Sequence, residues 1–295
     1  RAACLEKAGV GWTSCAVAPM ADNKLLHAML RVPSVERAVA FWEARGARRL
    51  TEPGKGSCFV GYGEHRDATF FALELSPAAE PIANADIAYI GLSMLPPGAT
   101  LPSRNGEEEQ GKLENETPAD RFAAFMLDRE RRTPEGGSVD GIEVRSVASA
   151  PGDPLARFAL SVRDPDATAR FYCDILGMRE VFRSEQEVCV RYVSDDSEGN
   201  TEWGGLGGPN GGVPTTLVLT TEAAPGGAGV EAFDHLAVGC ADVEAAHAAV
   251  WEGNSAAVFL EPTPMFGTVV CGVKDPDGRK VYLVEEAGFR AGGSP

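Results

Sequence analysis

The stretch HAMLRVPSVERAVAFW, residues 27–42, decides the fold of this chain because it joins a strand to a helix through only two residues. HAMLRV is typical of a strand, which breaks at Pro33. Ser34 then offers a side-chain oxygen to the orphan amides of a first helical turn. Behind it, apolar residues recur at helical spacing, at Val35, Ala38, Val39 and Trp42. The stretch therefore predicts a strand that leads directly into an amphipathic helix.

The same pattern recurs along the chain. Residues 156–181, ARFALSVRDPDATARFYCDILGMREV, align with residues 26–50 at an offset of 130 until one residue is inserted near Leu176. Residues 235–248, HLAVGCADVEAAHA, align with the opening stretch at an offset of 208. A fainter copy, YIGLSML, begins at Tyr89 and meets two prolines before a helix can start. Repetition on this scale indicates one supersecondary unit used four times.

The copies agree at informative positions. Asp164 and Asp242 fall on Ser34, so a helix-capping side chain recurs in each clear copy. His235 falls on His27. The alignment therefore preserves both the helix start and a histidine near the start of the strand.

Short β-rich segments follow each clear copy, and DPDG at 275–278 predicts a turn between two alternating strands. The unit is therefore a strand, a helix, and two or three further strands. We predict an α+β fold of tandem βαβββ modules in two domains, residues 24–150 and 151–295, after an N-terminal extension at 1–23. An acidic insertion at 96–118, rich in Pro, Gly and Glu, is expected to be a mobile surface segment outside the core.

Composition limits the partners and the compartment. The formal net charge of -16 disfavours phosphate backbones and anionic lipids, so nucleic acid is not an expected partner. The chain has no run of about 18 apolar residues, the length that could span a bilayer, so an integral membrane protein is not expected. Seven cysteines without a CxxC pair indicate a reducing compartment. The first twenty residues, basic and nearly free of acid, suggest a cytoplasmic or organellar protein, in a plastid or mitochondrion after transit-peptide removal.

Several of these motifs together resemble the vicinal oxygen chelate (VOC) superfamily, which has the glyoxalase/bleomycin resistance/dioxygenase fold. The likeness is carried by LLHAMLRV with its FW helix, by LGM, by FALEL and by DPDGRKVYLVEEAGFR near the C-terminus. It is most similar to the two-domain lactoylglutathione lyases (glyoxalase I) and to the glyoxalase-domain-containing proteins. The resemblance covers roughly residues 24 to 290, apart from the insertion.

The resemblance implies paired modules that form a cupped sheet around one divalent metal. Two His or Gln and two Glu side chains would hold zinc, nickel, manganese or cobalt, with open positions for two neighbouring substrate oxygens. The metal would polarise these oxygens while a metal-bound glutamate moves a proton between adjacent carbons.

When the family's ligand positions are matched to this chain, only some positions of each site hold a residue that can bind a metal. In the first domain His27 and Glu74 match two metal ligands, and Glu74 is the candidate catalytic residue. Tyr89 and Arg145 occupy the other two positions. In the second domain the four positions are held, in chain order, by Arg157, Val218, His235 and Tyr282. An arginine repels a divalent cation and valine has no donor atom, so the second domain is predicted to hold no metal.

The first domain is predicted to have a degenerate metal site. His27 and Glu74 supply two ligands, and Tyr89 could contribute weakly. Three further side chains could add a donor: Glu64, His65 and Glu143. Arg145 could instead form an ion pair with Glu74. In that case His27 is a hydrogen-bonded residue of a fold that is retained without its metal. The alternative is that His27 is a metal ligand.

Three functions follow from this ligand count. The first is a glyoxalase I-like protein that binds a small molecule or a protein partner without lyase turnover, with no cofactor. The second is an active lactoylglutathione lyase that detoxifies methylglyoxal with a divalent metal in the first domain. The third is a structural subunit of a larger organellar assembly, which uses residues 96–118 as a contact arm.

Overall fold

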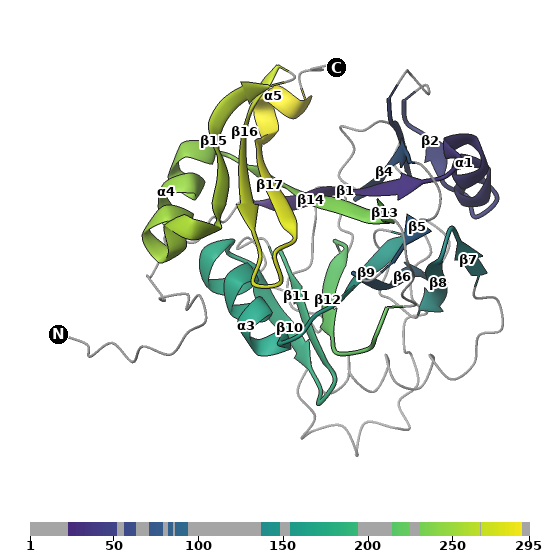
Figure 1. The fold of residues 1–295 in the computed structure, drawn as a ribbon, viewed down its shortest axis with the longest axis horizontal. Coiled ribbons are helices and arrows are strands. Elements are labelled where there is room, and N and C mark those ends of the chain that lie inside the picture. Colours follow the sequence, from purple (N-terminus) through teal and green to yellow (C-terminus); the bar gives the residue numbers. More distant parts are fainter. Residues whose placement is uncertain are drawn as a thin grey trace, which may run out of the picture.

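The computed structural model describes residues 23–51, 56–62, 71–78, 82–84, 86–93, 137–147, 154–193, 214–224, 230–265 and 267–290. Within these residues the strands form an eight-stranded sheet, a seven-stranded sheet and one short pair (Figure 1). The insertion predicted at 96–118 and nearly all of the N-terminal extension lie outside the described residues. The α+β architecture of strand-rich modules agrees with the prediction.

The eight-stranded sheet combines the first and last modules of the chain. Its strands, in spatial order, are β15 (Val258–Met265), β16 (Thr268–Lys274), β17 (Lys280–Glu285), β14 (Phe233–Cys240), β1 (Lys24–Val32), β4 (Ala72–Pro77), β3 (Cys58–Gly61) and β2 (Arg48–Arg49). The central contact is the antiparallel pair of β1 and β14.

The seven-stranded sheet combines the two inner modules. Its strands, in spatial order, are β10 (Arg179–Arg183), β11 (Glu187–Arg191), β12 (Thr216–Thr220), β9 (Leu155–Ser161), β6 (Ile87–Ser93), β8 (Ile142–Val147) and β7 (Gly137–Val139). Its central contact is the antiparallel pair of β6 and β9. The short third sheet pairs β5 (Ile82–Ala83) with β13 (Val230–Glu231).

This arrangement corrects the expected grouping of modules. We expected consecutive modules to share a sheet, but the first module pairs with the fourth and the second with the third. The repeat identifies each module, but the backbone hydrogen bonds between two first strands do not depend on residue type. The alignment therefore could not show which modules pair with each other. The boundaries proposed at 23/24 and 150/151 lie beside or within undescribed stretches and remain predictions.

The predicted helix starts are confirmed. The clear copies continue into α1 (Val35–Glu43), α3 (Pro165–Arg170) and α4 (Val243–Asn254). The side chains of Ser34, Asp164 and Asp242 each accept a hydrogen bond from the backbone N–H three residues later, at 3.3, 2.9 and 2.9 Å. These bonds satisfy one orphan amide of each first turn, which is why the same position holds Ser or Asp in each of the three clear copies.

The inserted residue near Leu176 has a structural counterpart. Directly after α3, residues Phe171–Ile175 form a π-helical turn, whose wider ring accommodates an extra residue without breaking the helix. A 3-10 turn, Ser255–Ala257, similarly follows α4, and the short helix α5 (Glu286–Arg290) follows the last strand. The main hydrophobic core lies between the sheets and helices α1, α3 and α4. It contains fully buried aromatic side chains from both pairs of modules: Trp42, Phe158, Phe171 and Tyr172.

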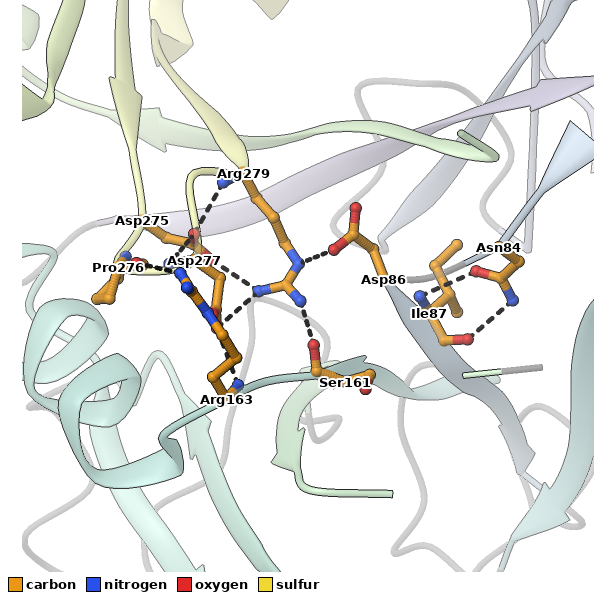
Figure 2. A network of polar contacts seen from close by, with 9 residues as sticks. All are labelled: Asn84, Asp86, Ile87, Ser161, Arg163, Asp275, Pro276, Asp277 and Arg279. Atoms are coloured by element: carbon orange, nitrogen blue, oxygen red, sulfur yellow. Dashed lines mark hydrogen bonds and ion pairs between the residues drawn. The ribbon is translucent and has the colours of Figure 1, made fainter. Parts of the chain in front are cut away.

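The predicted DPDG turn is present and joins the two sheets. The backbone N–H of Gly278 donates to the carbonyl of Asp275 at 2.9 Å, and Gly278 has a φ of +88°, which favours glycine. Arg279 leaves this turn and reaches Asp86 at the start of β6, at 2.6 Å, and the carbonyl of Ser161 at the end of β9 (Figure 2). The fourth module is therefore tied to both inner modules by one buried guanidinium.

Candidate metal site

Three metal-ligating side chains converge where the first and fourth modules meet. His27 lies on β1, Glu74 on the parallel strand β4 and His235 on the antiparallel strand β14. Glu74 and His235 both pair with Met29 of β1, so the two neighbouring strands bring them to either side of this strand. Their alternating neighbours, such as Leu73 and Leu236, belong to the main core. The three side chains therefore lie on the sheet face opposite helices α1 and α4.

The distances among these groups suit a bound cation. His27 Nε2 lies 3.2 Å from Glu74 Oε2 and 3.4 Å from His235 Nε2. All three donor atoms lie within 4.8 Å of one another, and this is the one such cluster of potential ligands within the described part of the chain. A metal about 2.0–2.2 Å from each donor sets neighbouring donors roughly 3.0–3.5 Å apart. The residues present therefore fit a divalent metal.

The protonation states also suit a metal. Burial raises the pKa of Glu74, but the His27 and Ser57 side chains outweigh it and hold that pKa below its ordinary value. Ser57 donates to Glu74 Oε1 at 2.5 Å. Burial, followed by the nearby charge of His27, lowers the pKa of His235 to about 4. At neutral pH an ionised carboxylate and a neutral imidazole therefore face the same point, which is what metal binding requires.

Aromatic rings fix the orientation of the histidines. The His27 ring lies stacked near Phe289 at 6.0 Å and meets the edge of Phe59 at 5.1 Å. His27 Nδ1 is buried and has no hydrogen-bond partner among the described residues. Packing between rings, and not a hydrogen bond from the far nitrogen, therefore directs Nε2 toward the cluster. Tyr282 meets the ring of His235 at 4.7 Å.

The new module pairing changes the predicted ligand count. Sequence alignment placed His27 and Glu74 in one site and His235 with Tyr282 in another, which left each site short of donors. The structure brings these four positions together, so three of the four hold a metal-ligating residue and Tyr282 holds the fourth. The signal that could have revealed this was the alignment of His235 with His27, because two first-strand histidines imply two first strands side by side.

The remaining four positions lie together on the seven-stranded sheet. Arg157 Nη1 donates to the Tyr89 hydroxyl at 3.3 Å, and the Arg145 guanidinium lies 4.2 Å from the centre of the Tyr89 ring. Val218 is buried beside Tyr89 in a small apolar cluster. Burial raises the pKa of Tyr89 well above its ordinary value, so the phenol stays protonated. Two guanidiniums, a phenol and an isopropyl group do not fit a metal. The set that was predicted to hold no metal, Arg157, Val218, His235 and Tyr282, is divided between the two sheets.

Two smaller expectations have different outcomes. The ion pair considered between Arg145 and Glu74 is not formed, because the two residues lie on different sheets. Arg145 instead pairs with Glu143 of its own strand at 2.8 Å and with Glu222 at 3.0 Å. Glu143 therefore pairs with Arg145 on the seven-stranded sheet and does not contribute to the candidate metal site. The other two proposed donors, Glu64 and His65, lie outside the described residues.

Comparison with known proteins supports the fold assignment. Residues 155–283 match the Glyoxalase/Bleomycin resistance protein/Dioxygenase superfamily. The crystal structure of glyoxalase I from Zea mays superposes with a TM-score of 0.61 at 21% identity, covering 91% of this chain and 94% of that chain. A mutant of the same enzyme gives a TM-score of 0.60 at 20% identity, covering 90% and 95% of the two chains.

No curated protein matches the chain significantly by sequence. The superfamily match and the shared two-domain fold nevertheless confirm the resemblance to the vicinal oxygen chelate superfamily and to glyoxalase I. None of the described helices is both long and apolar enough to cross a membrane.

Proposed function

We propose that this chain is a divalent-metal-dependent enzyme that acts on a small molecule with two adjacent oxygen atoms. The observation that carries the proposal is the convergence of His27, Glu74 and His235, with all donor atoms within 4.8 Å of one another. A site that combines two imidazoles with one carboxylate suits zinc, nickel, manganese, cobalt or iron. The interpretation as a degenerate binder without turnover rested on two donors in one site and one in the other, and it loses that basis when three converge.

Each residue has a definable task in this proposal. The bound metal would supply Lewis-acid polarisation of the substrate oxygens. Glu74 presents an ionised oxygen whose low pKa makes it a better ligand than proton acceptor. Ser57 holds the second oxygen of Glu74 and so fixes the carboxylate's orientation. His27 and His235 direct their Nε2 atoms to the same point, and with three protein ligands open positions remain for substrate.

The second candidate is lactoylglutathione lyase activity, as in the glyoxalase I enzymes that the chain resembles. Three of the four ligand positions are filled as that activity requires. Tyr282 is the residue that separates the candidates, because a phenol is a poor substitute for a glutamate carboxylate that must exchange protons near neutral pH. The alternative of a structural subunit docked through residues 96–118 stays a prediction, since that segment lies outside the described residues.

Metal analysis of the purified full-length chain tests the proposal. After loading and dialysis, we expect about one metal per chain in the wild type and in His247→Ala, which removes an imidazole from α4 outside the site. We expect loss of that metal in His27→Ala, Glu74→Gln and His235→Ala. Retention of stoichiometric metal in His235→Ala would contradict the three-ligand site, as would the absence of metal from the wild type.

A turnover assay then separates the two candidates. The hemithioacetal of methylglyoxal and glutathione is offered to the metal-loaded protein with and without a chelator. Isomerisation that is lost on chelation and in Glu74→Gln identifies the lyase. Stoichiometric metal without isomerisation favours a different substrate for the same site.

A further inference from the structure

Four arginines lie in one line across the seven-stranded sheet. Arg179 of β10 stands directly opposite Arg191 of β11. Val190 pairs with Leu217, so the next position, Arg191, meets Thr216, which in turn pairs with Arg157 of β9. Arg157 stands opposite Gly91 of β6, and Gly91 pairs with Arg145 of β8. We call Arg179, Arg191, Arg157 and Arg145 the arginine row.

The row occupies the sheet face away from α3. Adjacent residues on the same strands, such as Phe158 and Leu217, belong to the main core beneath the helix. Because side chains alternate along a strand, the arginines point to the opposite face. There they border the small apolar cluster that contains Tyr89 and Val218. The row is therefore separate from the metal cluster, which lies on the other sheet.

Space around the row depends on Gly91. A Cβ atom at this position would approach the Cβ of Arg157 to 2.9 Å and the side chain of Val147 to 3.0 Å. Glycine at the centre of the row therefore lets Arg157 and Val147 approach this strand without a clash.

Burial makes this concentration of positive charge costly. Arg157 is 3% exposed and Arg191 is 5% exposed, whereas Arg179 at the end of the row is exposed. Burial lowers the pKa of Arg191 to about 10, despite an opposing effect of Cys189. Like charges directly opposite each other on neighbouring strands are destabilising. A group of negative charge placed along the row would relieve both costs.

Described acids also lie on this face of the sheet. Glu143 and Glu222 both pair with Arg145, and Glu187 lies on β11 two residues before Cys189. Arg157, Arg179 and Arg191 make further contacts within the protein, but a guanidinium has five donors and can keep such contacts while it receives an anion.

We propose that the arginine row binds a small anionic molecule through a phosphate or carboxylate group held between Arg157 and Arg191. The planar forks of the two guanidiniums match the paired oxygens of either group. The hydroxyl of Thr216, which lies between the two arginines in the sheet, supplies a further donor at the centre of the row. This proposal does not depend on the metal site.

Calorimetric titration of the chelator-treated full-length chain tests the row. Pyrophosphate and citrate serve as the probes, because they distinguish a phosphate from a carboxylate source. We expect saturable binding of at least one probe, weakened about tenfold or more in Arg157→Gln and in Arg191→Gln. Arg183→Gln is the matched control, since Arg183 lies on β10, is 46% exposed and pairs with Glu180 and Asp166. The control should bind as the wild type does.

Hydrogen exchange of the wild type provides evidence that does not depend on a variant folding. Addition of the bound probe should slow amide exchange in β9 and β11, and leave β1 and β14 unchanged. Three results would overturn the proposal: no saturable binding of either probe, equal binding by the wild type and both glutamine variants, or protection confined to the eight-stranded sheet.

Discussion

Replacing Arg279 with methionine is predicted to destabilise the protein more than any other single arginine change in the described residues. Its side chain is 6% exposed and lies between Asp86, Asp275 and Asp277, whose side chains are 25%, 0% and 8% exposed. Figure 2 shows Arg279 among these three carboxylates. Methionine preserves most of the aliphatic volume but removes the charge. The three carboxylates would then face one another in a largely dry environment.

The magnitude follows from this burial. Removal of one partner from a buried ion pair leaves an uncompensated charge and costs about 3–5 kcal/mol. Arg163 offers the matched contrast, because it also contacts Asp277, at 2.5 Å, yet its own side chain is 80% exposed. Loss of an exposed charge pair costs about 1 kcal/mol or less. Arg279→Met should therefore exceed Arg163→Gln by at least about 2 kcal/mol.

The pH dependence provides an internal check. Burial raises the pKa of Asp275 to about 6, against the opposing effect of Arg279. The folded state thus holds this proton up to about pH 6, while the unfolded chain releases it near 3.8, so the contribution of Asp275 to stability falls as pH rises through that window. Without Arg279 the pKa of Asp275 rises further. The penalty of Arg279→Met should consequently be smaller at pH 5 than at pH 8.

Urea unfolding of both variants at pH 5 and pH 8, in the presence of a chelator, measures these differences. If Arg279→Met costs no more than Arg163→Gln at pH 8, the guanidinium is not a buried link between the sheets. A penalty that is equal at the two pH values would refute the assignment of the uncompensated charge to Asp275.

Three other measurements test the metal site and the core. Tyr282→Glu should offer a fourth ligand, a second carboxylate beside His235, and tighten zinc binding by about tenfold, or ~1.4 kcal/mol, in competition with a chelator. Unchanged affinity would place residue 282 outside the ligand set. Because the pKa of His235 falls from 6.5 to about 4 on folding, the apo protein should lose up to about 3 kcal/mol between pH 6.5 and pH 4, and His235→Gln should abolish that loss. Trp42→Ala, at 1% exposure, should cost about 3–5 kcal/mol in urea unfolding, while Trp251→Ala, at 50%, should cost less than about 1 kcal/mol.

Local structure was predictable from the sequence because its causes are local. Ser34, Asp164 and Asp242 cap their helices through bonds to residues only three positions away, and Gly278 allows a turn that spans four residues. Such contacts depend on residue type and short spacing, both of which the sequence displays. The strands and helices of the described modules follow from these signals together with apolar periodicity.

The metal cluster was not predictable in full because it depends on which modules pair. His27 and His235 are 208 residues apart, and they meet only because β1 pairs with β14. All four modules offer a similar first strand, so backbone hydrogen bonding alone does not distinguish the possible pairs. Ser57, which orients Glu74, was missed for a related reason: it precedes a short strand, and nothing in its local sequence marks it.

The observed pairing also separates two kinds of residue set. A metal binds through all of its ligands at once, so a set of positions that contains two guanidiniums does not form a cation site even where a phenol lies beside them. The matched positions on the inner pair of modules hold two arginines, a tyrosine and a valine, whereas those on the outer pair hold three potential donors of four. Arg157 occupies the position in its module that His27 occupies in the first. One sheet therefore offers imidazole and carboxylate to a cation, while the equivalent face of the other offers guanidiniums, and the same scaffold position selects ligands of opposite charge.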